Sequence, residues 1–206
     1  MTFCPDCGRD AAPEAARRGT YRARSRRVPA GGRSQSSNVC PAMGTTIRRI
    51  RIDEASRLRA LRLAALADAP TAFGTTLAEA RRKPPAHWEQ LARDAATSHA
   101  YALFVAEEDR RWHGLAGGIH ERPDTVELVS MWVEPCRRRS GIGAALVEAV
   151  VAWARGLDAR RVTLWVTDVN HGAKSLYRRQ GFEETGQTQP LPSHPELQEV
   201  LMARDL

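Results

Sequence analysis

A basic turn followed by two glycines is the part of this 206-residue sequence best suited to bind an anion. An apolar, strand-like segment ends at Val133, and Pro135 interrupts it. The turn Arg138-Arg139-Ser140-Gly141-Ile142-Gly143 then leads into an apolar stretch that begins at Ala144. Glycines let backbone N–H groups approach an anion closely, and a helix N-terminus adds partial positive charge. The sequence therefore predicts a phosphate-binding cradle at this turn.

Three kinds of phosphate site compete for this turn. A P-loop requires Gly-Lys-Ser/Thr, and the turn has no lysine. A dinucleotide fingerprint requires a third glycine where Leu146 stands, and it opens a domain, whereas this turn follows three strand-like segments. The third kind is the Arg/Gln-x-x-Gly-x-Gly/Ala turn that binds the pyrophosphate of coenzyme A, and residues 138–143 match it in full.

A second segment follows about 30 residues later, where a strand-like run ending at Thr167 leads into Asn170-x-x-Ala173-x-x-x-Tyr177-x-x-x-Gly181-Phe182. The two motifs together, in this order, resemble the GCN5-related N-acetyltransferase (GNAT) superfamily over about residues 46–206. Arg139 departs from the pattern, because many relatives have glycine there. It lies outside the core motif but bears on the shape of the turn.

The resemblance implies an α+β (mixed α/β) fold, with a GNAT-like, mostly antiparallel central sheet of six to seven strands flanked by about four helices. It implies an acetyl-CoA-dependent N-acetyltransferase that moves an acetyl group to a primary amine by direct transfer in a ternary complex. Acetyl-CoA would be the cosubstrate, without a metal. The residues implied to bind it are Met131, Trp132 and Val133 through their backbone, the turn Arg138, Arg139, Ser140, Gly141, Ile142, Gly143 and Ala144, and then Asn170, Ala173 and Tyr177.

Acetyl transfer from a thioester to an amine needs a neutral amine and a proton for the leaving thiolate. By resemblance Tyr177 is the acid, with packing as its alternative role. Glu127 is the candidate base, because it is a lone carboxylate in the apolar segment 126–133; a solvent-facing position explains it equally well. Glu121 and bulk water are the other candidate bases. Cys136 has no histidine near it in sequence and is expected to be a bystander.

The acceptor pocket is expected to form from Asp68–Thr76 and from the strand edges around His120 and Trp165. Three aromatic residues either line this pocket or pack in the core: Phe73, Trp132 and Trp165. A small amine-bearing acceptor is the primary expectation. Acetylation of a protein N-terminus or lysine, and a non-catalytic CoA-binding regulator, are the alternatives. A homodimer is also left open.

Hydrophobic periodicity predicts the elements that position these residues. The expected helices are 53–67, capped by Asp53, then one from Pro84-Pro85, one at 141–156 and one at 173–180. The expected strands are 46–52, 101–107, 112–120, 126–133, 162–166 and short terminal ones near 182–185 and 199–203.

Charge is unevenly distributed along the chain. The net charge is 31 − 24 = +7, and residues 1–44 hold eight Arg and three acids, so 45–206 carry only +2. We therefore expect an N-acetyltransferase domain at 45–206 that does not bind nucleic acid, after a disordered Arg-rich extension at 1–44 or a start misassigned upstream of Met43. Cys4, Cys7 and Cys40 lack a fourth zinc ligand nearby. Four cysteines and no apolar run of 18 residues favour a cytoplasmic protein without a membrane partner.

Overall fold

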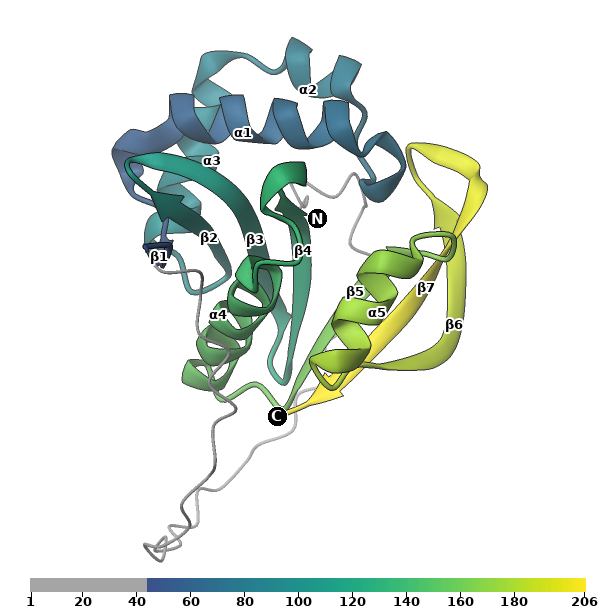
Figure 1. The fold of residues 1–206 in the computed structure, drawn as a ribbon. Coiled ribbons are helices and arrows are strands. Elements are labelled where there is room, and N and C mark those ends of the chain that lie inside the picture. The colour runs from purple at the N-terminus through teal and green to yellow at the C-terminus, as the bar shows by residue number, and fades with distance from the viewer. Residues whose placement is uncertain (1–43) are drawn as a thin grey trace, which may run out of the picture.

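A seven-stranded sheet forms the centre of the computed structural model, which describes residues 44–206 (Figure 1). The predictions for residues 1–43, including the cysteine-based zinc alternative, lie outside the described residues. The strand order is β1-β2-β3-β4-β5-β7-β6. The strands are β1 (Thr46–Arg49), β2 (Tyr101–Glu108), β3 (Arg111–Arg122), β4 (Thr125–Val133), β5 (Arg161–Thr167), β6 (Glu183–Leu191) and β7 (His194–Asp205).

All neighbouring strands pair antiparallel except β4 and β5, which are parallel. A parallel pair needs a crossover connection, and α4 (Ile142–Gly156) supplies it. The predicted mostly antiparallel α+β sheet is therefore confirmed. In the described part of the chain no helix has both the length and the apolar character needed to cross a membrane.

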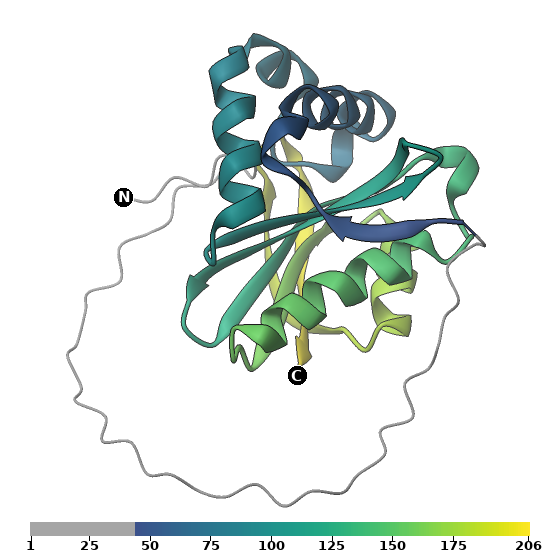
Figure 2. The same ribbon diagram turned by 90° about the vertical axis from the view of Figure 1, so that its left-hand side faces the viewer.

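Helices cover both faces of the sheet (Figure 2). On one face lie α1 (Ala55–Asp68), α2 (Leu77–Arg82) and α3 (Pro85–Thr97), and on the other lie α4 and α5 (His171–Arg179). The apolar positions predicted for α1 and α3 are buried, namely Leu58, Leu61, Ala65, Trp88, Leu91 and Ala95. One helix, α2, is not predicted by the sequence, because its six residues are too few to show helical periodicity.

Two apolar clusters lie on opposite faces of the sheet. One joins the inward face of α4, including Leu146 and Val150, to β4 and β5, while the other joins α1 and α3 to β2. Strand β4 contributes to both, because alternate side chains of a strand point to opposite faces. The position of β4 is therefore held by apolar contacts on both faces of the sheet.

Several predicted boundaries were wrong. The first strand was predicted at 46–52, but β1 ends at Arg49. Asp53 does not cap α1, because Ile52–Glu54 form a short 3₁₀ helix and Glu54 takes the cap position. The terminal strands β6 and β7 are longer than predicted. Most side chains of β6 are exposed, so its sequence lacks the alternation of apolar and polar residues that marks a half-buried strand.

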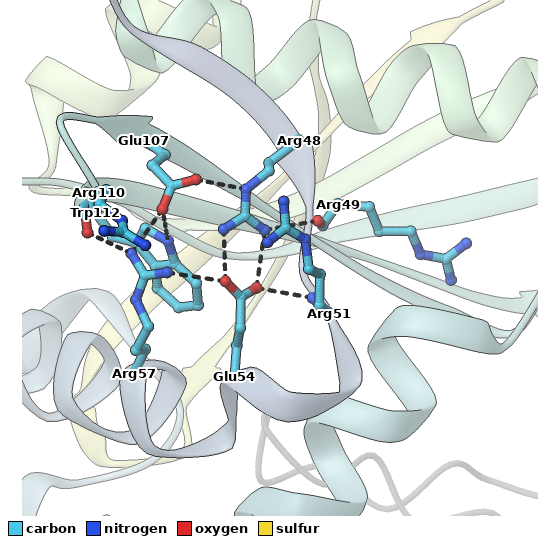
Figure 3. A network of polar contacts seen from close by, with 8 residues as sticks. All are labelled: Arg48, Arg49, Arg51, Glu54, Arg57, Glu107, Arg110 and Trp112. Atoms are coloured by element: carbon cyan, nitrogen blue, oxygen red, sulfur yellow. Dashed lines mark hydrogen bonds and ion pairs between the residues drawn. The ribbon is translucent and has the colours of Figure 1, made fainter.

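A polar network holds β1, α1 and the β2–β3 hairpin together (Figure 3). The Arg48 guanidinium contacts Glu54 at 2.6 Å and Glu107 at 2.7 Å, and Arg57 contacts the same two carboxylates at 2.9 and 2.8 Å. The indole N–H of Trp112 also donates to Glu107. Hydrogen bonds from Arg48 and Arg57 lower the pKa of Glu107 to about 2. The network fixes the edge of the sheet away from the predicted site.

Candidate active site

The parallel pair at the centre of the sheet opens along its length. Residues Thr125–Glu127 of β4 pair with Arg161–Thr163 of β5, and beyond Glu127 the two strands diverge (Figure 1). Within residues 44–206, no strand pairs with that edge of β4 from Leu128 to Val133. An unpaired strand edge presents N–H and C=O groups to which an extended molecule can hydrogen-bond.

A bulge lies where the two strands begin to part. The pairing of β3 with β4 shifts register between Leu115 and Gly117, and Ser130 has a φ of +55°. An extra residue on one strand increases local bend and twist. The sequence pattern did not reveal this bulge, which lies just beyond the last residues of β4 that pair with β5.

Residues Met131, Trp132 and Val133 follow the bulge on the diverging part of β4. Trp132 is buried in the cluster beneath α1 and α3, while Met131 and Val133 pack in the cluster with α4. Their side chains are therefore occupied by the core. What remains for a ligand is the backbone edge, as the resemblance implied, apart from the Val133 carbonyl, which accepts a hydrogen bond from Arg138.

The glycine turn has the backbone that an anion cradle requires. Gly141 occupies the cap position of α4 with φ +90° and ψ −15°, a conformation that favours glycine. Arg139 precedes it with φ +64°, and the hydroxyl of Ser140 donates to the Arg137 carbonyl at 2.6 Å. The first N–H groups of any α-helix lack intrahelical acceptors, so those at the start of α4 are directed at the turn.

Gly143 is where α4, β4 and α5 meet. A Cβ atom there would lie 3.2 Å from Cδ2 of Leu176 and 3.3 Å from Cε of Met131. The lack of a side chain thus lets the start of α4 approach β4 and α5 closely. These features fit the pyrophosphate and the extended arm of coenzyme A: backbone donors at the cradle continue into the free edge of β4.

Arg138 connects this turn to the end of α1. Its Nε donates to the Val133 carbonyl at 3.0 Å, and its Nη2 forms an ion pair with Asp68. The same carboxylate oxygen accepts the indole N–H of Trp132 at 2.8 Å. Asp68 therefore joins the cradle to the start of the predicted acceptor loop, a contact that no local pattern in the sequence predicts.

The other side of the turn is held by β3. Nδ1 of His113 lies 2.6 Å from Oε2 of Glu134, and this contact with His113 lowers the pKa of the Glu134 carboxyl. Cys136 is exposed beside it in the short 3₁₀ helix Pro135–Arg137. The ion pair of Arg138 and the contact between His113 and Glu134 hold the turn on both sides, so its backbone needs little rearrangement to bind an anion.

Helix α5 places Tyr177 against the core. The side chain of Asn170 accepts the N–H of Ala173 at 3.1 Å, so the predicted cap is confirmed. Tyr177 is 5% exposed, and its ring packs edge-on against Phe182 at 5.9 Å between centroids. Burial raises the pKa of its phenol, which keeps the group protonated. A proton donor needs that state, and the acid role itself stays a prediction.

A small hollow of about 50 Å³, open to solvent, lies beside the first residues of the opening between β4 and β5. Glu127 lines it from β4 and Trp165 from β5. The other lining residues are Arg62, Ala72, Phe73, Gly74, Leu128, Val129, Ser130 and Glu199. The loop that follows α1 closes one side, since Thr167 and Ser193 each donate a 2.6 Å hydrogen bond to its carbonyls, at Thr71 and Phe73.

Only some of the residues predicted for the acceptor pocket line this hollow. Glu127, Phe73 and Trp165 come together in the hollow, whereas His120 lies near the Pro123 carbonyl and Trp132 packs in the core. Glu121 is exposed at the end of β3.

Sequence reasoning missed two charged residues of the hollow, Arg62 and Glu199. Both carried a usable signal. Arg62 stands four residues after Leu58 and three before Ala65, on the buried face of α1, and Glu199 directly precedes the apolar run at 200–202.

Known proteins share this sequence pattern and this fold. A model of the acetyltransferase (GNAT) family matches residues 65–182. An uncharacterized N-acetyltransferase of Mycobacterium tuberculosis is 34% identical over 106 residues, which cover 51% of this chain and 67% of that protein. One from Methanocaldococcus jannaschii is 39% identical over 64 residues, covering 31% and 28%. The chain thus spans only part of the curated relatives that it matches.

Solved structures match over most of the described chain. A GNAT-family acetyltransferase from Streptococcus pneumoniae has a TM-score of 0.68 at 20% identity, covering 79% of this chain and 99% of that one. A Salmonella typhimurium protein, yncA, solved with its cofactor acetyl-CoA, has a TM-score of 0.65 at 19% identity, covering 79% and 94%. At these identities the likeness establishes the fold.

Proposed function

Because the chain belongs to the GNAT acetyltransferase family, we propose that residues 45–206 form a domain that transfers an acetyl group from acetyl-CoA to a primary amine. The observation that carries the proposal is a continuous path. The hollow lined by Glu127 lies beside the opening of β4 from β5, and the free edge of β4 continues from there to the glycine turn. A long thioester bound along this path would present its acetyl end to the hollow.

Each part of the path has a task in direct transfer. The backbone at Gly141–Ala144 binds the pyrophosphate, and the edge of β4 at Met131–Val133 pairs with the pantetheine arm. Acetyl-CoA supplies an activated thioester when bound. Glu127 accepts the proton that the acceptor amine must lose, and Tyr177 donates a proton to the departing sulfur. Asn170 and Ala173 set the start of the helix that carries Tyr177.

The test is an amine panel with acetyl-CoA, measured by thiol release and by the mass of the product. We expect turnover of at least one small primary amine, and formation of one acetylated product per thiol released. Stabilisation of the protein by CoA without thiol release on any amine would contradict the proposal and favour a CoA-binding regulator instead.

Two variants identify the base. Glu127→Gln should lower kcat/KM most at low pH, where the acceptor amine is charged, and less as the amine deprotonates by itself. Glu121→Gln makes the same change in an exposed side chain at the end of β3. If Glu127→Gln loses activity equally at every pH, or if only Glu121→Gln alters the profile, Glu127 is not the base.

A further inference from the structure

The arginine that opens the glycine turn is already bound by a carboxylate from the acceptor side of the molecule. Nη2 of Arg138 forms an ion pair with Oδ2 of Asp68, the last residue of α1. Asp68 directly precedes the loop at 69–74, which contributes Phe73 to the hollow beside β4. This ion pair therefore joins the proposed donor site to the predicted acceptor loop.

The same guanidinium covers the end of the free edge of β4. The N–H of Glu134 donates to the His113 carbonyl on β3 at 2.8 Å. Successive residues of a strand direct their backbone groups to opposite sides, so the Val133 carbonyl points away from β3. That carbonyl accepts a 3.0 Å hydrogen bond from Nε of Arg138. The Arg138 side chain thus binds the last carbonyl of the free edge and the end of α1 at once.

Asp68 has a second partner that does not involve Arg138. Its Oδ2 also accepts the indole N–H of Trp132 at 2.8 Å, and Trp132 is only 7% exposed. The side chain of Asp68 is 26% exposed and that of Arg138 is 47% exposed. An anion at the turn can therefore reach the guanidinium while the carboxylate keeps its hydrogen bond to the indole.

A phosphate and a carboxylate suit the same guanidinium, because both offer paired oxygens to its planar N–H groups. Resting on the proposed function, we propose that Asp68 is a positioning residue that holds Arg138 in the free protein and releases it to the pyrophosphate of acetyl-CoA. Breaking the ion pair detaches the start of the 69–74 loop from the turn. Thr167 and Ser193 still hold the later carbonyls of this loop. Binding at the donor site therefore changes how the acceptor loop is held.

The test measures binding of CoA to the full chain by calorimetry, so it requires neither an acceptor nor turnover. Asp68→Asn removes the charge and keeps an oxygen for the indole of Trp132. It should lower the Kd for CoA about threefold to fivefold, the range expected when a partly exposed ion pair no longer competes. An unchanged or raised Kd in the folded variant would overturn the inference, because a residue that only supports the turn weakens binding when it is altered.

Two further variants show whether the effect passes through Arg138. Asp205→Asn removes the same charge from another aspartate–arginine pair, which joins β7 to Arg161 of β5 at 2.6 Å, and it should leave the Kd unchanged. Arg138→Gln removes the guanidinium, so adding Asp68→Asn to it should no longer tighten binding. An equal gain in Asp205→Asn, or a gain that persists beside Arg138→Gln, would assign the effect to overall charge and overturn the role of Asp68.

Hydrogen exchange on the unaltered protein decides the question even if Asp68→Asn does not fold. The N–H groups of Ala69 and Ala72 donate to the carbonyls of Ala65 and Ala69, so their exchange can be followed by NMR. Saturating CoA should speed this exchange at least about twofold, because the end of α1 opens more readily once Asp68 is released. Unchanged or slower exchange would show that Arg138 stays on Asp68 when phosphate binds, and the inference would be wrong.

Failure of this inference is distinct from failure of the proposed function. If the unaltered protein does not bind CoA in the same titration, both are overturned. If CoA binds and amines are acetylated while Asp68→Asn leaves the Kd unchanged, the transferase stands and only the role of Asp68 is wrong.

Discussion

Tyr177→Phe is the most direct test of the proposed chemistry, because it removes one oxygen and leaves the ring. The ring is nearly buried and packs edge-on against Phe182, and phenylalanine preserves that contact. The free energy of unfolding should therefore change by less than about 1 kcal/mol. If the phenol protonates the leaving sulfur, kcat should fall about 100-fold, which corresponds to about 2.7 kcal/mol in the activation barrier.

The pKa of Tyr177 adds a second expectation. Burial raises this pKa above its ordinary value of about 10, so the phenol loses its proton only at a higher pH. The kcat of the unaltered protein should therefore not decline, from this group, between about pH 7 and 10. The matched control is Phe182→Leu, which loosens the packing around Tyr177 and keeps the hydroxyl.

Single-turnover measurements with saturating acetyl-CoA separate the chemical step from product release. Phe182→Leu should lower the melting temperature more than Tyr177→Phe does, and it should affect the chemical step less. The acid assignment fails if Tyr177→Phe acetylates the acceptor at the unaltered rate. It also fails if the two variants slow the chemical step equally, because the effect would then come from packing.

Three further perturbations test the cradle and its supports. Gly141→Val should raise the Kd for acetyl-CoA at least tenfold in a calorimetric titration, because a branched side chain strains a φ of +90°. The control is Gly156→Ala, whose added Cβ has no atom within 4 Å and which should bind acetyl-CoA as the unaltered protein does. Asp68→Ala should destabilise the fold by about 1 to 3 kcal/mol in urea unfolding, because the buried indole N–H of Trp132 loses its acceptor. Asp68→Asn keeps an oxygen and should lose less stability, and equal losses in the two variants would contradict this role of Asp68. Hydrogen bonding lowers the pKa of Glu107 to about 2, so its contribution to the free energy of unfolding is complete above the unfolded pKa of about 4.3 and is lost as the pH falls toward 2. In acid unfolding curves Glu107→Gln should therefore lose about 1 to 2 kcal/mol less stability over this pH range than the unaltered protein, and identical curves would exclude the network as a cause.

The parts of the fold that the sequence predicted are those where a residue's neighbours in the chain determine its structure. The apolar faces of α1, α3 and α4 show helical spacing, and a glycine with positive φ at the start of α4 is required by the local backbone. Asn170 caps α5 through a bond to a residue three positions later. Each of these features is contained in fewer than about twenty residues of sequence.

The parts that the sequence did not predict depend on contacts between distant segments. Asp68 is exposed at the end of a helix by every local criterion, yet it meets Trp132 and Arg138, 64 and 70 residues away. The lining of the hollow arises in the same way, since Arg62 of α1 and Glu199 of β7 come from distant segments of the chain.

This division explains why the sequence predicted an acyl-donor site but not the lining of the hollow beside it. The proposed binding of an acyl donor uses a turn and a helix start, which are local, and backbone groups, which every residue type provides. The hollow beside β4 is lined by side chains from α1, β4 and β7, and no one segment of the sequence contains that set. Glu199→Gln changes that lining without altering the turn, so it should alter turnover of the acceptor while the affinity for acetyl-CoA stays the same. A parallel loss of both would show that the two sites are not separable in this way.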